Sequence, residues 1–201
     1  MFSTHCGYCS LADAYLSRPD LDKGFDDTRE GQQRPGHFRG VATIVAKLLN
    51  IVQPTRAYFG QKDATQCALI RRMVDDMNID VTIQVESTVR EIDGLAMSSR
   101  NAYLSPAERA AAPIIYQSLS AARDVFDGLV EGHDSVPAQA LEEIVRSKLS
   151  LEPLVSDIQY VAIDDKLTML PLATVQKEAG AVVSIACKIG HVRLIDNVIL
   201  Q

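Results

Sequence analysis

The sequence lacks several features that would place the protein in a special class. None of its apolar runs approaches the length that a helix needs to cross a bilayer. Its first residues show neither a basic stretch followed by an apolar one nor an excess of arginine, so neither a secretory signal nor a mitochondrial presequence is indicated. No internal repeat is visible. We therefore expect a cytoplasmic protein that has no membrane partner.

An excess of positive charge is also missing. The 201 residues include 20 Lys and Arg against 26 Asp and Glu, which gives a formal net charge of -6. A mildly acidic chain is a poor nucleic-acid binder unless its basic residues cluster, so no nucleic-acid partner is expected. With 47% hydrophobic and 23% charged residues, the composition is that of a globular protein of one domain or two small ones.

Cysteine is scarce, with four in the whole sequence. Cys6 and Cys9 form a Cys-x-x-Cys motif, but the chain before them is too short for the strand that precedes a redox motif of this kind. A zinc site would need two further ligands, and a single histidine lies beside the pair. We interpret the pair as part of an irregular, reduced tail over residues 1–29. Cys67 and Cys187 lie in apolar stretches and are expected in the core.

The segment from residue 30 to residue 88 alternates between helical and strand patterns. Apolar residues at helical spacing over residues 41–52 predict a helix, and the face expected to be buried is Val41, Ile44, Val45, Leu48, Leu49 and Val52. A short strand over residues 56–59, a helix after Asp63 and an alternating strand over residues 79–85 follow. The predicted fold class is α/β, with a partial Rossmann-like (nucleotidyltransferase-type) parallel sheet in this segment.

Residues 89–201 predict a smaller α+β domain, which would act as a lid. A capping box with proline at the first helical position predicts a helix from Ser105 to Gly128, and a second helix follows Pro137. Strands are expected over residues 158–163, 181–186 and 192–200. A hairpin turn at residues 188–191 joins the last two, so the helices would pack on a small antiparallel sheet.

The strongest chemical signal is the segment of residues 59–66 (FGQKDATQ), where a parallel strand ends and a helix begins. Open α/β sheets bind ligands at the carboxyl ends of their strands, and a glycine lets backbone approach a ligand closely. A helix N-terminus beside Lys62 suits phosphate. Asp63 could accept hydrogen bonds from ribose or simply cap the helix, and Gln66 could bind a small polar substrate. On spacing alone, a capped helix after a strand explains the segment equally well.

A second signal is the run Ser98, Ser99 and Arg100 beside a glycine-containing turn. Two hydroxyls and a guanidinium could form a phosphate clamp. Such a run is also common in solvated loops, and on sequence alone that interpretation is favoured.

A third signal comes just before the first long helix, where Arg34, His37 and Arg39 could contact an anionic substrate. A lone histidine is more often a hydrogen-bonded structural residue, so His37 is not assigned as a base.

These signals belong to five segments, which are residues 34–43 (RPGHFRGVAT), 50–54 (NIVQP), 57–63 (AYFGQKD), 93–105 (DGLAMSSRNAYLS) and 194–197 (LIDN). In this order and at this spacing they resemble the pantothenate synthetase (pantoate–β-alanine ligase) family. The resemblance covers the chain from residue 28 to its end.

The resemblance implies an ATP-dependent condensation. Such enzymes use ATP and Mg²⁺ to adenylate the carboxylate of pantoate and release pyrophosphate; β-alanine then attacks the pantoyl adenylate to give pantothenate and AMP. The implied partners are therefore small molecules. The enzyme needs no covalent nucleophile, because it must align the reactants, neutralise phosphate charge and keep water from the mixed anhydride.

The resemblance also implies roles by matching position. The candidate catalytic residues are Lys62, which would contact ATP phosphate, and Ser98, Ser99 and Arg100. These last three would form the counterpart of the KMSKS-type loop of class I synthetases and close on the phosphates. No residue is assigned as a metal ligand.

Other positions would contact the rest of the nucleotide and the acid substrate. The further nucleotide-binding candidates are Phe59, Gly60 and Asp63, the last two on the ribose, and Val89 and Met97, which would lie beside adenine through their backbone. The pantoate-binding candidates are Gln66, Arg34, His37 and Arg39.

The family's first Rossmann segment, with its His-x-Gly-His nucleotide motif, has no counterpart in the sequence. We therefore expect a truncated synthetase with doubtful stand-alone activity. A half Rossmann sheet would expose a strand edge and a helix face, through which two copies could pair as a homodimer. Two alternatives stay open: a non-catalytic fragment that binds or regulates a full-length synthetase, and another adenylyl-transferring α/β enzyme with a different acid substrate.

Overall fold

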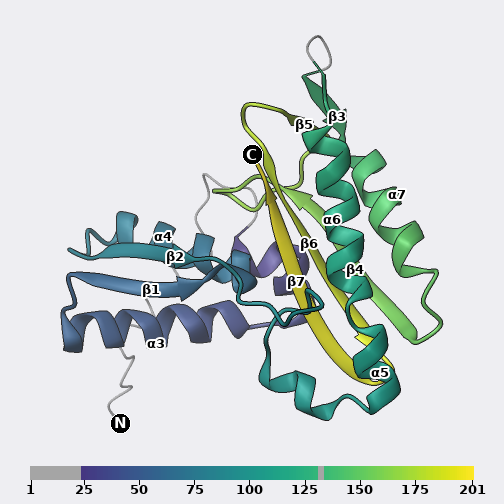
Figure 1. Cartoon of the computed structure of the whole chain (residues 1–201). Coiled ribbons are helices and arrows are strands. Elements are labelled where there is room, and N and C mark those ends of the chain that lie inside the picture. Colours follow the sequence, from purple (N-terminus) through teal and green to yellow (C-terminus); the bar gives the residue numbers. More distant parts are fainter. Residues whose placement is uncertain (1–23, 131–133) are drawn as a thin grey trace. The chain divides into compact units, whose positions relative to one another are not determined.

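The computed structural model describes residues 24–130 and 134–201 (Figure 1). The predictions for Cys6 and Cys9, and for the tail up to residue 23, lie outside the described residues. The described chain forms two compact units. The first consists of the residues up to Gly60 together with Thr65–Glu86, and the second of Gln61–Ala64 together with Ser87–Gln201.

The first unit begins with short helical segments. The 3-10 turn η1 (Phe25–Asp27) leads into α2 (Arg29–Gln33), and the Thr28 hydroxyl caps α2 by accepting a hydrogen bond from the Gly31 N–H at 3.1 Å. The irregular tail predicted up to residue 29 is therefore wrong for its last residues. The prediction failed there because charged residues hid the helix start.

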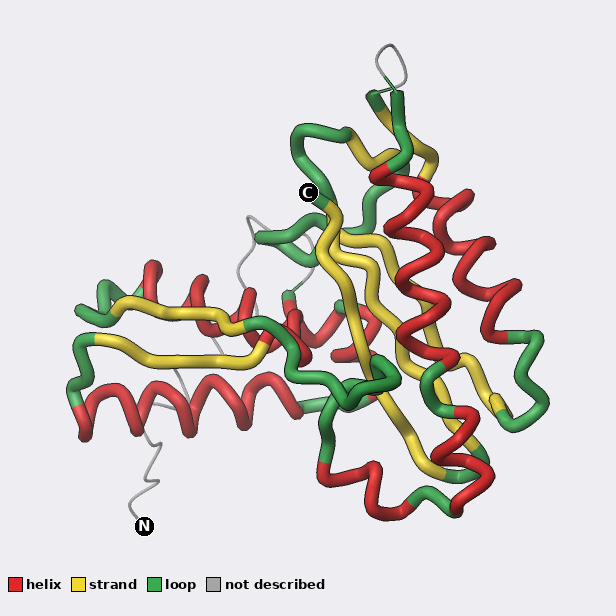
Figure 2. The backbone as a smooth tube through the Cα atoms, viewed as in Figure 1, coloured by secondary structure: helices red, strands yellow, loops and turns green. Residues whose placement is uncertain are grey.

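A strand–helix–strand unit follows and forms a parallel sheet (Figure 2). β1 (Arg56–Gly60) and β2 (Thr82–Glu86) pair in parallel, and α4 (Ala64–Asp76) makes the crossover between them. β2 begins three residues later than predicted, because residues 79–81 precede the first pair of the ladder. The predicted parallel arrangement is confirmed.

α3 (His37–Val52) confirms the predicted helix but buries a different face. Its buried side chains are Phe38, Ala42, Ala46 and Leu49. The side chains of Ile44, Leu48, Ile51 and Val52 are exposed instead, at 57%, 53%, 78% and 65%. The prediction that Ile44, Leu48 and Val52 are buried is therefore wrong within the described structure. Two alanines lie on the inward face between Phe38 and Leu49, and four of the large aliphatic side chains lie on the outside.

The described part of the second unit contains the α-helices α5, α6 and α7. The Ser105 hydroxyl and the Glu108 carboxylate form the predicted capping box at the start of α5 (Pro106–Ala111). The single helix predicted as far as Gly128 is wrong, because Pro113 separates α5 from α6 (Ile114–Asp127). Proline has no N–H to donate to the preceding turn, so the helix restarts there. α7 (Ala138–Leu149) follows Pro137, as predicted.

Two of these helices, α6 and α7, pack on an antiparallel sheet of three strands (Figure 1). β4 (Val155–Asp164), β6 (Ala181–Ile189) and β7 (Val192–Leu200) lie in the order β4-β6-β7. α6 and α7 pack on each other and on this sheet. The core between them includes Leu119, Phe126, Leu141, Val183 and Ile185.

The predicted hairpin between the last two strands is confirmed, with Ile189 paired to Val192. Gly190 adopts the left-handed conformation (φ 57°) that the tight turn requires. A short pair formed by β3 (Ser135–Pro137) and β5 (Thr174–Gln176) was not predicted. The predicted fold class, a partial Rossmann-like parallel sheet followed by a smaller α+β domain, is confirmed. Within the described residues, no helix has the length and apolar character to span a membrane.

Candidate functional site

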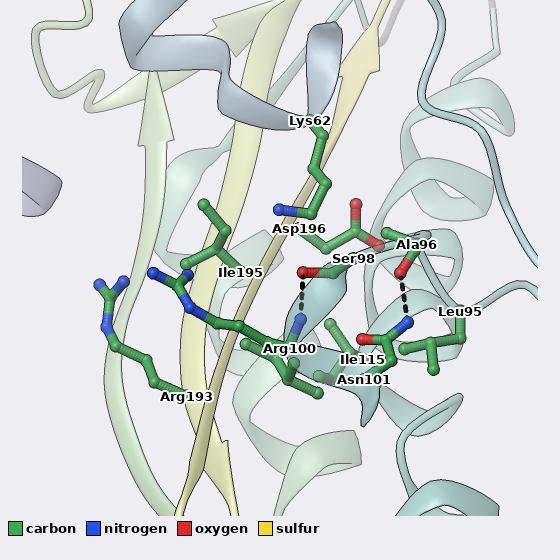
Figure 3. Close-up of a pocket in the computed structure, with 11 residues that line it drawn as sticks. Lys62, Leu95, Ala96, Ser98, Arg100, Asn101, Ile115, Arg193, Ile195 and Asp196 are labelled. Atoms are coloured by element: carbon green, nitrogen blue, oxygen red, sulfur yellow. Dashed lines mark hydrogen bonds between the residues drawn. The ribbon is translucent and has the colours of Figure 1, made fainter. Parts of the chain in front are cut away.

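A small pocket in the second unit collects residues from distant parts of the chain (Figure 3). Lys62 comes from the 3-10 turn η2 (Gln61–Asp63), and Ser98 and Arg100 come from the segment that enters η3 (Ser99–Tyr103). The remaining lining residues are Leu95, Ala96, Asn101, Ile115, Arg193, Leu194, Ile195 and Asp196. Two of the motifs singled out in the sequence, 59–66 and 98–100, therefore contribute side chains to the same pocket.

Three cationic side chains line this pocket, those of Lys62, Arg100 and Arg193. The one carboxylate in the lining, that of Asp196, forms an ion pair with Arg90. The lining therefore keeps an excess of positive charge. Guanidinium and ammonium groups gathered in this way suit a polyanion such as the phosphate chain of a nucleotide.

The enclosed volume is only about 10 Å³. That is room for about one water molecule, so a phosphate group would meet the charged side chains at the mouth of the pocket. The arrangement can supply charge and hydrogen bonds to one part of a ligand. It does not enclose a whole nucleotide.

Asp196 lines the pocket, is buried, and forms a bidentate pair with the partly buried Arg90. The Arg90 Nη1 and Nη2 donate to the two Asp196 carboxylate oxygens at 2.6 and 3.0 Å, and Asp196 is 3% exposed. Burial raises the pKa of the Asp196 carboxyl, while the Arg90 guanidinium and the Asn197 N–H act in the opposite direction. The guanidinium also lies 3.9 Å from the centre of the Tyr116 ring, so Arg90 is held from two sides.

Asn197 holds the turn that carries Lys62. Its Nδ2 donates to the backbone oxygens of Gln61 and Lys62, both at 2.9 Å. Its Oδ1 accepts a hydrogen bond from the Gln61 Nε2, also at 2.9 Å. The turn therefore packs on β7, which explains why Gln61–Ala64 belong to the second unit although their neighbours in sequence belong to the first.

The segment around Ser98 is ordered by its own hydrogen bonds. The Ser98 hydroxyl accepts from the Arg100 N–H at 3.3 Å, and the Asn101 Nδ2 donates to the Ala96 carbonyl at 3.1 Å (Figure 3). The Asn101 Oδ1 is buried without a hydrogen-bond partner among the described residues. It is an acceptor within the lining that the sequence analysis did not consider.

The other predicted nucleotide contacts lie near these segments. Ser99 is exposed at the start of η3 and is not part of the lining. Val89 and Met97 are joined through their backbones, since the Met97 N–H donates to the Val89 carbonyl at 2.9 Å, and their side chains are 66% and 52% exposed. Asp63 is exposed at the end of η2. Contact of these residues with a nucleotide stays a prediction.

The remaining predicted site residues belong to the first unit. Phe59 and Gly60 end β1, and Gln66 lies in the first turns of α4. The other three, Arg34, His37 and Arg39, surround the start of α3. The Arg34 carbonyl accepts from the His37 N–H at 3.0 Å, and Arg34 lies 3.8 Å from the Glu30 carboxylate. The centres of the His37 and Phe38 rings lie 5.3 Å apart. Contact of these residues with pantoate stays a prediction.

The sequence profile described as pantoate-beta-alanine ligase matches residues 12–199. The chain belongs to this family. The match begins earlier than residue 28, where the resemblance was expected to start, and thus includes part of the segment interpreted as a tail.

Relatives with known names agree with the pantoate–β-alanine ligase assignment. The pantothenate synthetase of Herpetosiphon aurantiacus is 47% identical over 171 residues, which are 85% of this chain and 59% of the relative. A crystal structure of pantothenate synthetase from Thermus thermophilus superimposes with a TM-score of 0.76 at 43% identity, covering 86% of this chain and 59% of that one. The chain therefore spans about three fifths of the length of these relatives.

A second solved structure, of a pantoate–β-alanine ligase, carries ligands. It comes from Francisella tularensis, was determined with β,γ ATP and β-alanine, and has a TM-score of 0.61 at 32% identity. The alignment covers 91% of this chain and 57% of that one.

The family resemblance implies a magnesium ion, and the described residues offer no set of side chains that would coordinate it. Among residues 24–130 and 134–201, no group of three or more His, Cys, Asp or Glu side chains could hold a metal ion. The one carboxylate in the pocket is already paired with Arg90. Mg²⁺ commonly binds through substrate phosphates and water rather than through a dedicated protein site.

Sequence reasoning missed several residues of this pocket. Arg193 and Asp196 line the pocket, Arg90 and Asn197 support it, and Asn101 carries the unpartnered acceptor. One signal was available: the pair Asp196–Asn197 interrupts the apolar run from Leu194 to Leu200, and buried polar groups in a strand need specific partners.

Proposed function

We propose that this chain takes part in the ATP-dependent condensation of pantoate with β-alanine, through a pantoyl-adenylate intermediate. The observation that carries the proposal is the joint lining of one cationic pocket by Lys62, Ser98 and Arg100. Membership of the pantoate–β-alanine ligase family supports pantoate and β-alanine as the substrates, and the Francisella relative was crystallised with an ATP ligand and β-alanine. We further propose that the reaction takes place in the cytoplasm, with small molecules as partners.

The proposed chemistry has two steps and needs no covalent enzyme intermediate. A pantoate carboxylate oxygen attacks the α-phosphorus of ATP, and the bond to pyrophosphate breaks. The β-alanine amine then attacks the carbonyl of the mixed anhydride, AMP leaves with the bonding electron pair, and the amine loses a proton. The protein contributes by positioning the reactants and by stabilising the charge that develops on phosphate oxygens.

Lys62 and Arg100 suit that role because both are cationic and line the same pocket, with the Ser98 hydroxyl in the same lining. We propose that they contact the phosphates together with Ser99. In the same proposal, Phe59, Gly60 and Asp63 contact the ribose side of the nucleotide, and Val89 and Met97 lie beside adenine. Gln66, Arg34, His37 and Arg39 would bind pantoate.

The proposal is tested by incubating the purified chain with Mg²⁺, ATP, pantoate and β-alanine and measuring pantothenate and AMP by mass spectrometry. We expect both products at a rate well below that of a full-length relative, because the chain spans about three fifths of such relatives, and a still lower rate in Arg100→Ala, because one phosphate-stabilising group is lost. Arg71→Ala is the matched control, since Arg71 is exposed on α4 in the first unit. No product above background, or equal rates in the two variants, would contradict the proposal.

A second candidate function is a non-catalytic one, in which the chain binds a full-length synthetase. The observation that favours it is the exposed apolar face of α3, formed by Ile44, Leu48, Ile51 and Val52. Exposed apolar faces mark interaction surfaces. Among residues 24–130 and 134–201, no third strand pairs with the β1–β2 sheet, so its edges offer a further place to pair. Mass photometry of the chain alone and mixed with a full-length relative separates a homodimer, a mixed complex and a monomer. A monomer in both samples would contradict this candidate.

A further inference from the structure

We infer that Asn197 is a positioning residue, which sets the place of Lys62 at the pocket. Asn197 is 3% exposed within β7, the last strand of the sheet. Its side chain makes three hydrogen bonds to the turn that carries Lys62, each at 2.9 Å. The inference rests on the proposed function, because the position of Lys62 matters only where an anionic ligand binds beside it.

The amide chemistry of Asn197 fits this task closely. Backbone carbonyls accept hydrogen bonds and never donate them, so the NH₂ group must face the oxygens of Gln61 and Lys62. Its two hydrogens satisfy one carbonyl each, and the amide oxygen is left to accept from the Gln61 side chain. An aspartate here would place carboxylate oxygens against two carbonyl oxygens, which repel them.

The Lys62 turn needs outside support. η2 has three residues, and a 3-10 segment of that length makes too few hydrogen bonds to be stable alone. The lysine side chain adds four further rotatable bonds between backbone and charge. Because the backbone of Lys62 is already fixed, less conformational entropy is lost when the lysine binds a phosphate, and binding is stronger.

Asp196, the neighbour of Asn197 on β7, supports the segment that carries Ser98. Asp196 holds Arg90, and the Arg90 Nη1 also donates to the Gly94 carbonyl at 3.1 Å, in the turn just before Ser98. The Arg90 Nη2 donates a hydrogen bond to the Asn197 carbonyl oxygen at 3.3 Å. Consecutive residues of one strand therefore fix both segments that bring polar side chains to the pocket.

The test compares Asn197→Ala with the control Asn50→Ala. Asn50 is exposed on α3, and its amide makes one local hydrogen bond to the Ala46 carbonyl at 2.8 Å. Binding of ATP and of adenosine is measured by calorimetry for the wild type, both variants, Lys62→Ala and the double variant Lys62→Ala/Asn197→Ala. Adenosine lacks the phosphates, so it reports on general damage to the site.

We expect Asn197→Ala to weaken ATP binding about tenfold and to leave adenosine binding unchanged. In the Lys62→Ala background the second substitution should change ATP affinity by less than about twofold, because its effect passes through Lys62. Equal losses for ATP and adenosine, or additive effects in the double variant, would overturn the inference.

Hydrogen exchange measured by mass spectrometry tests the inference without any ligand. Asn197→Ala should increase exchange in the peptide over residues 58–66, while the peptides from β4 and β6 keep their wild-type rates. Unchanged exchange over residues 58–66 would overturn the inference. If the wild type binds no ATP but the local exchange increases, the proposed function fails and the structural support of Lys62 by Asn197 stands.

Discussion

The Asn197 side-chain amide and the Lys62 backbone carbonyl are joined by a hydrogen bond of 2.9 Å, although 135 positions separate them in the sequence. The next residue on the strand, Asp196, pairs with Arg90 across 106 positions. The last strand of the sheet thus fixes both polar segments of the pocket. Asn197 supports the segment with Lys62, and Asp196 supports, through Arg90, the segment with Ser98.

Arg90→Ala is expected to lower the free energy of unfolding by about 3–5 kcal/mol, because it leaves the buried Asp196 carboxylate without its partner. The double variant Arg90→Met/Asp196→Leu should lose less, since it buries no unpaired charge. Arg146→Ala is the control: it breaks an exposed pair with Glu142 and should cost less than about 0.5 kcal/mol. Urea unfolding followed by circular dichroism measures all three, and a loss below about 1 kcal/mol for Arg90→Ala would contradict the account.

Gly94→Ala is expected to destabilise the second unit by about 2–4 kcal/mol. Gly94 has a φ of 92°, which L side chains rarely adopt, and an added Cβ would collide with the Tyr116 ring. Gly40→Ala is the control, because that position lies in α3 with open space around it and alanine favours helix. Thermal unfolding measures the midpoints of both variants, and Gly94→Ala should have the lower one. Equal midpoints would show that the turn tolerates a side chain.

Asp93 should contribute stability that depends on pH. Its hydrogen bond from Arg109, at 2.6 Å, lowers the pKa of the carboxyl in the folded state. The contribution is therefore present above the unfolded-state pKa of about 3.9 and disappears as the pH falls through the lower, folded-state pKa. Both side chains are about one third exposed, so solvent screening limits the effect to no more than about 1 kcal/mol.

The matching experiment measures the unfolding free energies of the wild type and Asp93→Asn at pH 7 and at pH 2. The wild type should be more stable at pH 7, and the difference should be smaller at pH 2. A difference that is the same at both values would mean that the ion pair is not its cause.

Cys187 should resist alkylation in the folded protein. It is fully buried in β6, and burial raises the pKa of its thiol to about 12. Because the thiolate is the reactive form, iodoacetamide at pH 8 should leave the peptide with Cys187 unmodified until urea is added. Rapid labelling of this cysteine without denaturant, detected by peptide mass spectrometry, would show that β6 opens readily.

Periodicity was sufficient to predict much of the fold. The alternation of helices and strands gave the parallel β1–β2 pair, and the Ser105–Glu108 capping box located the start of α5, because both signals are local in sequence. The buried face of α3 could not be predicted in the same way. The apolar stripe of that helix is wide and includes Ile44 and Leu48 as well as the two alanines, so only tertiary packing decides that Ala42 and Ala46 face inward.

The pocket was predictable in part. Lys62 stands out because it follows a glycine where a strand ends. The Ser98–Arg100 run stands out because two hydroxyls and a guanidinium are adjacent in a polar segment. Arg90, Arg193 and Asn197 do not stand out, because their importance arises from partners more than 30 positions away. Buried polar residues inside the apolar strand β7 were the visible hint, and their partners could be found only in the structure.

The most direct test of the central claim is the calorimetric titration of ATP with Mg²⁺ into the wild type, Lys62→Ala and the control Lys148→Ala, which alters a lysine in the last turn of α7. The account predicts saturable binding to the wild type and to Lys148→Ala, with an affinity at least about tenfold lower in Lys62→Ala. Absence of saturable binding to the wild type, or equal affinities in all three proteins, would contradict the assignment of this pocket to nucleotide phosphate.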